Sequence, residues 1–84
     1  MQENQEQKKP TLGQRRVRVE FNPSKTDYVH QLKMAGANFI DLIDMSACKT
    51  NFTEEELADF RRLKALAMTA IEEGTSWAVK SATI

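Results

Sequence analysis

Apolar side chains recur at the three-and-four spacing of an α-helix in two long stretches of the chain, separated by a short polar link. The first repeat predicts a helix from about Lys25 to Met45, and the second predicts a helix that follows Thr53 and ends near Ala82. Helices joined by so short a link pack as antiparallel neighbours. We therefore expect an all-α protein built on a two-helix antiparallel hairpin.

Each predicted helix begins at a capping signal. Ser24 precedes the first helix with Asp27 three residues later, and Thr53 precedes the second with Glu56 at the same offset. A hydroxyl at the N-cap accepts a hydrogen bond from a free N–H of the first turn, and the acidic side chain can bond back to the cap. Gly74 interrupts the second repeat, but apolar residues continue beyond it, so we expect the helix to pass through this glycine.

The chain is small for a domain that folds by burying apolar surface alone. At 84 residues it needs support that small proteins find in disulfides, metals or partner chains. Cys48 is the only cysteine and His30 the only histidine, so neither an intramolecular disulfide nor a thiolate–imidazole metal cluster is available. Because the two helices carry more apolar surface than one hairpin covers, we expect a homo-oligomer.

Small side chains form a ridge along the second helix. The ridge has one member every four residues: Ala70, Gly74, Ala78 and Ala82. Such a ridge allows another helix to approach closely, because ridges of this spacing pack into the grooves of a neighbouring helix. The alternative is that the alanines serve only as helix formers. That leaves Gly74 unexplained, since glycine disfavours a helix by about 1 kcal/mol relative to alanine.

The N-terminal part differs in composition from the hairpin. Residues 1–14 are rich in Gln, Glu and Lys and contain little to bury, so we expect a mobile polar tail followed by a folded domain over residues 15–84. In the next segment Val17, Val19 and Phe21 alternate with charged residues. That period of two predicts a short extended segment with one apolar face, lying along a helix or pairing with a second copy.

The charge balance and the N-terminus argue against several classes of protein. Twelve basic and twelve acidic residues give a formal net charge of zero, whereas proteins that bind duplex DNA usually carry a basic surplus. No apolar run reaches the ~20 residues that span a bilayer, and residues 1–9 lack the apolar stretch of a secretory signal. With a single free cysteine, we expect a cytoplasmic protein that binds neither membranes nor duplex nucleic acid.

Few residues could support catalysis. Cys48 lies in the predicted link, far in sequence from His30, whereas nucleophilic catalysis needs a nucleophile beside a base. The carboxylates of residues 54–56 and 72–73 are interpreted as helix caps and solvated faces, because adjacent helical residues point in different directions. We expect no enzymatic activity, no metal and no cofactor.

Residues suited to an anionic nucleotide are better represented. Lys33 lies beside the apolar stripe of the first helix, where its stem could carry the ammonium into a cleft or simply into solvent. Phe21 could stack on a base or pack on the helix as a staple. Arg61 and Arg62, with Lys64 nearby, could hold phosphates or form a solvated charge run. The complete set of candidates is Phe21, Asn22, Tyr28, Lys33, Arg61 and Arg62.

Several of these residues belong to a pattern that resembles a known family. The pattern comprises Phe21-Asn22-Pro23-Ser24, then Val29, Leu32-Lys33, Ala37 and Ile40-Asp41, then Ala67, Thr69, Glu72-Glu73 and Trp77-Ala78-Val79-Lys80. It resembles the phage anti-CBASS cyclic-oligonucleotide sponges, whose helical hairpin is shared with the larger anti-Thoeris sponges. The match covers roughly residues 17 to 83, and its most specific part is the final Glu-Glu-x-x-x-Trp-Ala-Val-Lys run.

The resemblance implies a homo-hexamer that sequesters cyclic nucleotide messengers of bacterial defence, both dinucleotides and trinucleotides, in the cytoplasm of the infected host. It implies that an aromatic residue ahead of the first helix stacks on a base and that a lysine in that helix contacts phosphate. By motif these are Phe21, a phenylalanine where some relatives have tyrosine, and Lys33. An arginine of the second helix serves a separate site on a threefold axis. Arg62 matches it best, and Arg61 is the alternative.

Two other functions are compatible with the sequence. The chain could be a small helical regulator that binds a protein or DNA through a basic N-terminal arm containing Arg15, Arg16 and Arg18. That arm would contact phosphates, so its affinity for DNA would fall steeply with salt. The chain could also be a purely structural assembly protein, which would form oligomers without responding to any ligand.

Overall fold

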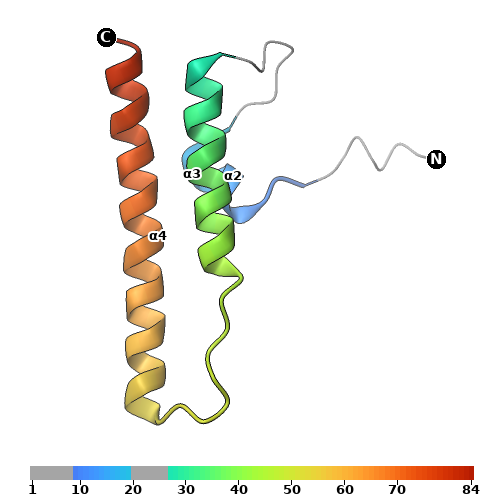
Figure 1. The fold of residues 1–84 in the computed structure, drawn as a ribbon, viewed down its shortest axis with the longest axis vertical. Helices are drawn as coiled ribbons and strands as arrows, with labels where there is room; N and C mark the ends of the chain where they lie inside the picture. Colours follow the sequence, from blue (N-terminus) through green and yellow to red (C-terminus); the bar gives the residue numbers. More distant parts are fainter. Residues whose placement is uncertain (1–8, 20–26) are drawn as a thin grey trace, which may run out of the picture.

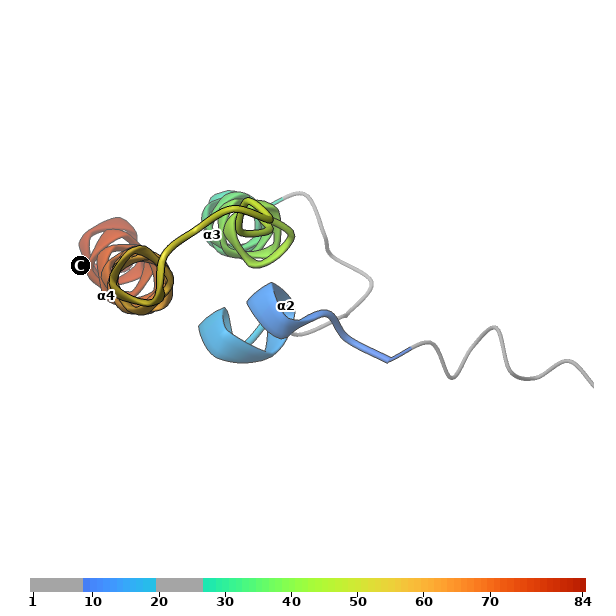
Figure 2. The same ribbon diagram turned by 90° about the horizontal axis from the view of Figure 1, so that it is seen from below.

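The structure, a computed structural model, describes residues 9–19 and 27–84. This part of the chain forms three α-helices, α2 (Leu12–Val17), α3 (Tyr28–Asp44) and α4 (Glu54–Ala82). Helices α3 and α4 lie side by side and run in opposite directions (Figure 1). Helix α2 lies against one face of this pair (Figure 2). The predicted all-α antiparallel hairpin is therefore confirmed.

Helix α4 begins and ends where the sequence predicts. The Thr53 hydroxyl accepts from the Glu56 N–H at 3.1 Å, and the Glu56 carboxylate accepts from the Thr53 N–H at 3.0 Å. The helix then runs through Gly74 to Ala82 without a break. Local capping chemistry thus fixes the start of the longest helix in the described part of the chain.

Helix α3 begins three residues later than predicted. Its first residue is Tyr28 rather than Lys25, and its N-cap is Asp27, whose carboxylate accepts from the His30 N–H at 2.7 Å. Asp27 therefore caps the helix itself. Ser24, the N-cap that the sequence predicts, lies outside the described residues. The helix ends at Asp44, with Met45 as its C-cap.

Helix α2 and the turn that follows it occupy residues 15–19 of the predicted extended segment, whose last residues, Glu20 and Phe21, lie outside the described residues. Thr11 and Gln14 form a capping box at the start of α2, with the two reciprocal hydrogen bonds at 2.9 and 3.1 Å. Within the described residues there is no β-strand. The helix also includes residues 12–14, which the composition places in the polar tail.

The alternation has a different physical origin. Helix α2 ends at Val17, and Arg18 takes up the left-handed conformation with φ 63° and ψ 52°. The N–H groups of Arg18 and Val19 then bond back to the carbonyls of Arg15 and Gln14 at 3.3 and 3.0 Å, the pattern of a Schellman motif. This turn brings Val19 back toward the core beside Val17, which reproduces a period of two without a strand.

The three helices share a small core. Its buried apolar residues are Val17, Ala37, Ile40 and Met68, and partly buried side chains of Leu12, Val19, Ile43 and Ile71 pack against them. All three helices contribute to this cluster, so α2 belongs to the same folding unit as the hairpin.

Two glycines permit the close approach of the helices. A Cβ added at Gly13 would lie 2.0 Å from the carbonyl oxygen of Ala37, so α2 crosses α3 at a point where only glycine fits. The Gly13 N–H, a free donor of the first turn, is satisfied by the Asp41 carboxylate at 2.7 Å. A Cβ at Gly36 would lie 2.1 Å from the Thr75 hydroxyl, which marks the corresponding contact between α3 and α4.

Much of the apolar surface remains exposed. Phe39, Leu42, Leu63, Leu66 and Trp77 each leave half or more of their surface open to solvent. A shallow groove of about 300 Å³ between α3 and α4 is lined by apolar and small residues, among them Ala70, Gly74 and Ala78 of the predicted ridge. Among the described helices, none has the length and apolar character needed to cross a membrane.

Candidate functional site

The predicted site residues fall into three groups. Phe21 and Asn22 lie outside the described residues. Tyr28 occupies the first position of α3 and exposes 64% of its surface. Lys33 lies in the N-terminal half of α3, whereas Arg61 and Arg62 lie in the N-terminal half of α4.

Lys33 lies at the junction of α2 and α3. It is half-buried, and its ammonium donates a hydrogen bond of 3.2 Å to the backbone carbonyl of Arg18, the residue that terminates α2. A cation at this position is favoured because the last carbonyls of a helix lack partners within the helix. An ammonium carries three N–H donors, so this contact orients the group and leaves donors for an anion.

The predicted basic group on α4 is divided by the fold. Lys64 donates to the carbonyls of Asp44 and Ser46, both at 2.9 Å, and thereby caps the end of α3. Arg62 makes an exposed ion pair with Asp59 at 3.6 Å. Since Lys33 and Asp44 are separated by roughly 16 Å of helix, the structure does not bring Lys33 together with Arg61 and Arg62.

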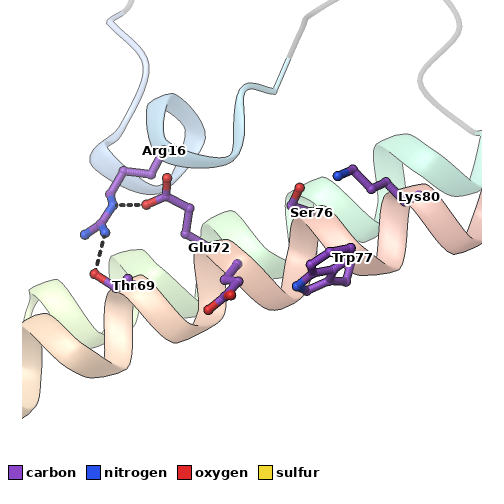
Figure 3. A pocket seen from close by; sticks show the side chains of 7 residues that line it. Arg16, Thr69, Glu72, Ser76, Trp77 and Lys80 are labelled. Atoms are coloured by element: carbon purple, nitrogen blue, oxygen red, sulfur yellow. Dashed lines mark hydrogen bonds and ion pairs between the residues drawn. The ribbon is translucent and has the colours of Figure 1, made fainter.

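A pocket of about 600 Å³ lies between α2 and the C-terminal half of α4 (Figure 3). Arg16 enters it from α2, and α4 supplies the remaining residues: Thr69, Glu72, Glu73, Ser76, Trp77 and Lys80. The Arg16 guanidinium donates from Nε to the Glu72 carboxylate at 2.7 Å and from Nη2 to the Thr69 hydroxyl at 3.2 Å (Figure 3). These bonds attach α2 to α4 across the mouth of the pocket.

The other end of the pocket is aromatic. Trp77 exposes 61% of its surface, and the Lys80 ammonium lies 4.7 Å from the centre of its ring. A cation at that distance from an indole face interacts favourably with it. The ring and the adjacent Ser76 hydroxyl offer stacking and hydrogen bonding to a flat, polar ligand.

The charges of this pocket balance. Arg16 and Lys80 contribute two positive charges, and Glu72 and Glu73 contribute two negative ones. Arg16 is already paired with Glu72. A phosphate that enters the pocket would have to displace the Glu72 carboxylate from Arg16, or else lie close to the negative charges of Glu72 and Glu73. The pocket therefore suits a base or sugar edge better than a phosphate group.

The pocket residues of α4 were not predicted as a site, although their spacing contains the signal. Positions 69, 72, 73, 76, 77 and 80 follow one face of a helix. Glu72 and Glu73 were interpreted as a solvated run because adjacent residues diverge. The structure places both at the pocket, with Glu72 bound to Arg16. Only the contribution of Arg16 depends on the docking of α2.

The chemistry available for catalysis is sparse in the part of the chain that the structure describes. Cys48 is exposed in the link between α3 and α4, and His30 lies in the first turn of α3. No group of three His, Cys, Asp or Glu side chains converges on a point among the described residues.

Comparison with protein families identifies the family of the hairpin. The family model described as the Acb2/Tad1 hairpin domain matches residues 13–83, from the glycine of α2 to the residue after α4. It thus covers all of α3 and α4 and most of α2. Comparison with curated proteins and with solved structures gives no match.

Proposed function

The chain belongs to the Acb2/Tad1 hairpin-domain family, and from that premise we propose that it is a phage anti-defence protein that sequesters cyclic oligonucleotide messengers without cleaving them. This activity needs binding alone, through charge-assisted contacts, stacking and exclusion of water from a preformed cleft. Captured messengers would no longer reach the effector of the CBASS response in the cytoplasm of the infected bacterium. The family match over residues 13–83 is the observation that carries the proposal.

We assign the phosphate contact to Lys33. Its ammonium is held at the α2–α3 junction by the Arg18 carbonyl at 3.2 Å, and among the described residues no carboxylate pairs with it. A cation that is oriented but electrically unpaired is suited to receive a phosphodiester. Tyr28 lies at the exposed start of the same helix, and Phe21 and Asn22 precede it in the chain. These three residues are proposed to contact the base.

The site is proposed to lie between copies of the chain. The groove between α3 and α4 and the exposed apolar residues Phe39, Leu42, Leu63 and Leu66 support a homo-oligomer, because this much apolar surface favours a partner. The resemblance to the sponge family favours a hexamer. A cyclic dinucleotide has near-twofold symmetry, so two copies related by a dyad can offer each half the same lysine and aromatic residue.

A second site for cyclic trinucleotides is part of the proposal. Arg62, with Arg61 as the alternative, would serve it around a threefold axis. The exposure of both arginines and their distance from Lys33 along the hairpin are compatible with a separate site. The weak, exposed ion pair of Arg62 with Asp59 at 3.6 Å would give way to a phosphate at little cost.

The alternative function, a regulator with a basic N-terminal arm, is less well supported by the geometry. Arg16 is bound to Glu72 and Thr69, so one of the three arginines of that arm is already paired within the chain. Residues 15–17 also belong to a helix that packs on the hairpin. An arm folded in this way presents fewer cations to a nucleic acid.

Thermal shift and calorimetry with a panel of cyclic di- and trinucleotides test the proposed function. Saturation at 100 times the dissociation constant adds about 2.7 kcal/mol of stability, which a melting curve detects readily. Heat-denatured complexes should then release the nucleotide intact, as measured by chromatography and mass spectrometry. Absence of any stabilisation would refute capture, and recovery of a linear product would refute sequestration without cleavage.

A further inference from the structure

Arg18 has an unusual backbone for an arginine. Among the described residues it is the only non-glycine residue with a positive φ, at 63°. It occupies the left-handed position of the Schellman motif that ends α2, where glycine is the common residue because it has no Cβ to clash. An arginine here carries a conformational cost that a glycine would avoid.

The Arg18 side chain has no hydrogen bond or ion pair that would offset this cost in the part of the chain that the structure describes. It is exposed to solvent. Arg16, two residues earlier on the same helix, shows the contrast, since it binds both Glu72 and Thr69. No hydrogen bond or ion pair of this side chain with residues 9–19 or 27–84 therefore explains the cost of the Arg18 backbone.

The same residue positions Lys33. The Arg18 carbonyl accepts a hydrogen bond from the Lys33 ammonium at 3.2 Å, so the arginine side chain leaves the backbone within a few bonds of that cation. No carboxylate of the described residues is paired with either group. A cation that has no paired carboxylate among the described residues attracts an anion, and a second cation from the same junction would add to that attraction.

We propose that Arg18 is a second phosphate-binding residue, which grips the same phosphodiester as Lys33. The inference rests on the proposed function and extends it to a residue that sequence analysis placed only in a basic arm. Lys33 supplies a point charge oriented by the Arg18 carbonyl, and the guanidinium supplies a planar pair of donors that matches two phosphate oxygens. The left-handed turn at Arg18 brings its backbone carbonyl to the Lys33 ammonium, so both residues belong to the junction of α2 and α3.

The decisive variant is Arg18→Gly, because glycine is favoured at this φ. The variant should keep or raise the melting temperature of the free protein while its affinity for a cyclic dinucleotide falls by about tenfold or more. Arg15→Ala is the matched control. It removes the same charge from an exposed position of the same helix and should change affinity by about twofold at most. Arg18→Asn, a second residue that tolerates the left-handed region, should reproduce the loss.

The outcomes separate the two proposals. In one outcome the unmodified protein captures a cyclic dinucleotide, Lys33→Ala no longer binds that ligand, and Arg18→Gly binds it with unchanged affinity. Arg18 is then not part of the site, although the proposed function holds. If Arg15→Ala weakens binding as much as Arg18→Gly, the effect is one of overall charge and the assignment is wrong. If the unmodified protein binds no cyclic oligonucleotide, the proposed function itself fails. Light scattering on each variant should show unchanged assembly.

Discussion

Arg16 lies in α2 and Arg18 in the turn that ends this helix, and their side chains have opposite surroundings. Arg16 lies over α4 in an ion pair of 2.7 Å with Glu72, whereas Arg18 is exposed beside Lys33, with no acidic partner among the described residues. Arg16 and Glu72, which we call the paired region, therefore neutralise each other within the chain. Lys33 and Arg18, which we call the unpaired region, have no ion pair in the part of the chain that the structure describes. The comparison shows that the number of arginines in a segment says little about binding until their partners are known.

The difference also separates attachment from recognition. The paired region joins α2 to α4, and the unpaired region uses the end of α2 to orient Lys33. Both depend on the same docked helix, whose position is set by Gly13 against Ala37 and Asp41. Helix α2 is therefore the element through which the two regions can be perturbed together or one at a time.

The largest effect should come from Gly13→Ala, which disturbs both regions at once. The added Cβ would lie 2.0 Å from the Ala37 carbonyl oxygen, a backbone atom that cannot move aside cheaply. Thermal and urea unfolding should show a loss of about 3 kcal/mol, and capture of cyclic dinucleotide should weaken with it. Unchanged stability would mean that α2 is not docked in solution.

Lys33→Ala should affect only the unpaired region. Loss of a charge-assisted contact to phosphate should weaken cyclic dinucleotide binding about 100-fold by calorimetry, without a change in assembly. Lys49→Ala, which removes the same charge from an exposed position in the link between α3 and α4, is the control and should bind normally. Equal affinities for the two variants would remove Lys33 from the site.

These regions differ in how far the sequence predicts them. The hairpin and the start of α4 follow from local signals, because Thr53 and Glu56 cap the helix with groups three residues apart. The pocket residues of α4 share a helical face and could have been recognised by spacing. The sequence identifies Lys33 as a candidate for phosphate binding, whereas it indicates Arg18 only as part of a basic arm.

The sequence pattern does not predict helix α2, and the reason is physical. The alternation of Val17 and Val19 arises from a left-handed turn at Arg18 rather than from a strand, and a period of two does not distinguish these cases. The glycine that allows docking, Gly13, resembles a breaker in the sequence. Its role depends on Ala37, which lies more than twenty residues away and meets it only in the fold.

Gly74→Ala tests the face that neither region uses. A Cβ at this position meets nothing within 4 Å inside the hairpin, so the substitution should raise the stability of an isolated chain by about 1 kcal/mol through helix propensity. If another copy packs against the groove, the same methyl should instead weaken assembly, measured by light scattering over a dilution series. A gain in stability with unaltered assembly would place the proposed contact between copies elsewhere.

Glu72→Gln should have the smallest effect and bears most directly on the division between the two regions. The ion pair with Arg16 is partly exposed, at 25% and 43% for the two side chains, so removing the charge should cost no more than about 0.5 kcal/mol. The glutamine carbonyl can still accept from the arginine, which should keep α2 attached.

Glu73→Gln makes the same charge change at a pocket residue with no ion pair to Arg16 and serves as the control. Capture of cyclic dinucleotide should be equal in both variants, because Arg16 belongs to the attachment of α2. A gain in affinity confined to Glu72→Gln would mean that the released guanidinium reaches the phosphate, and the separation of paired from unpaired cations would then be wrong.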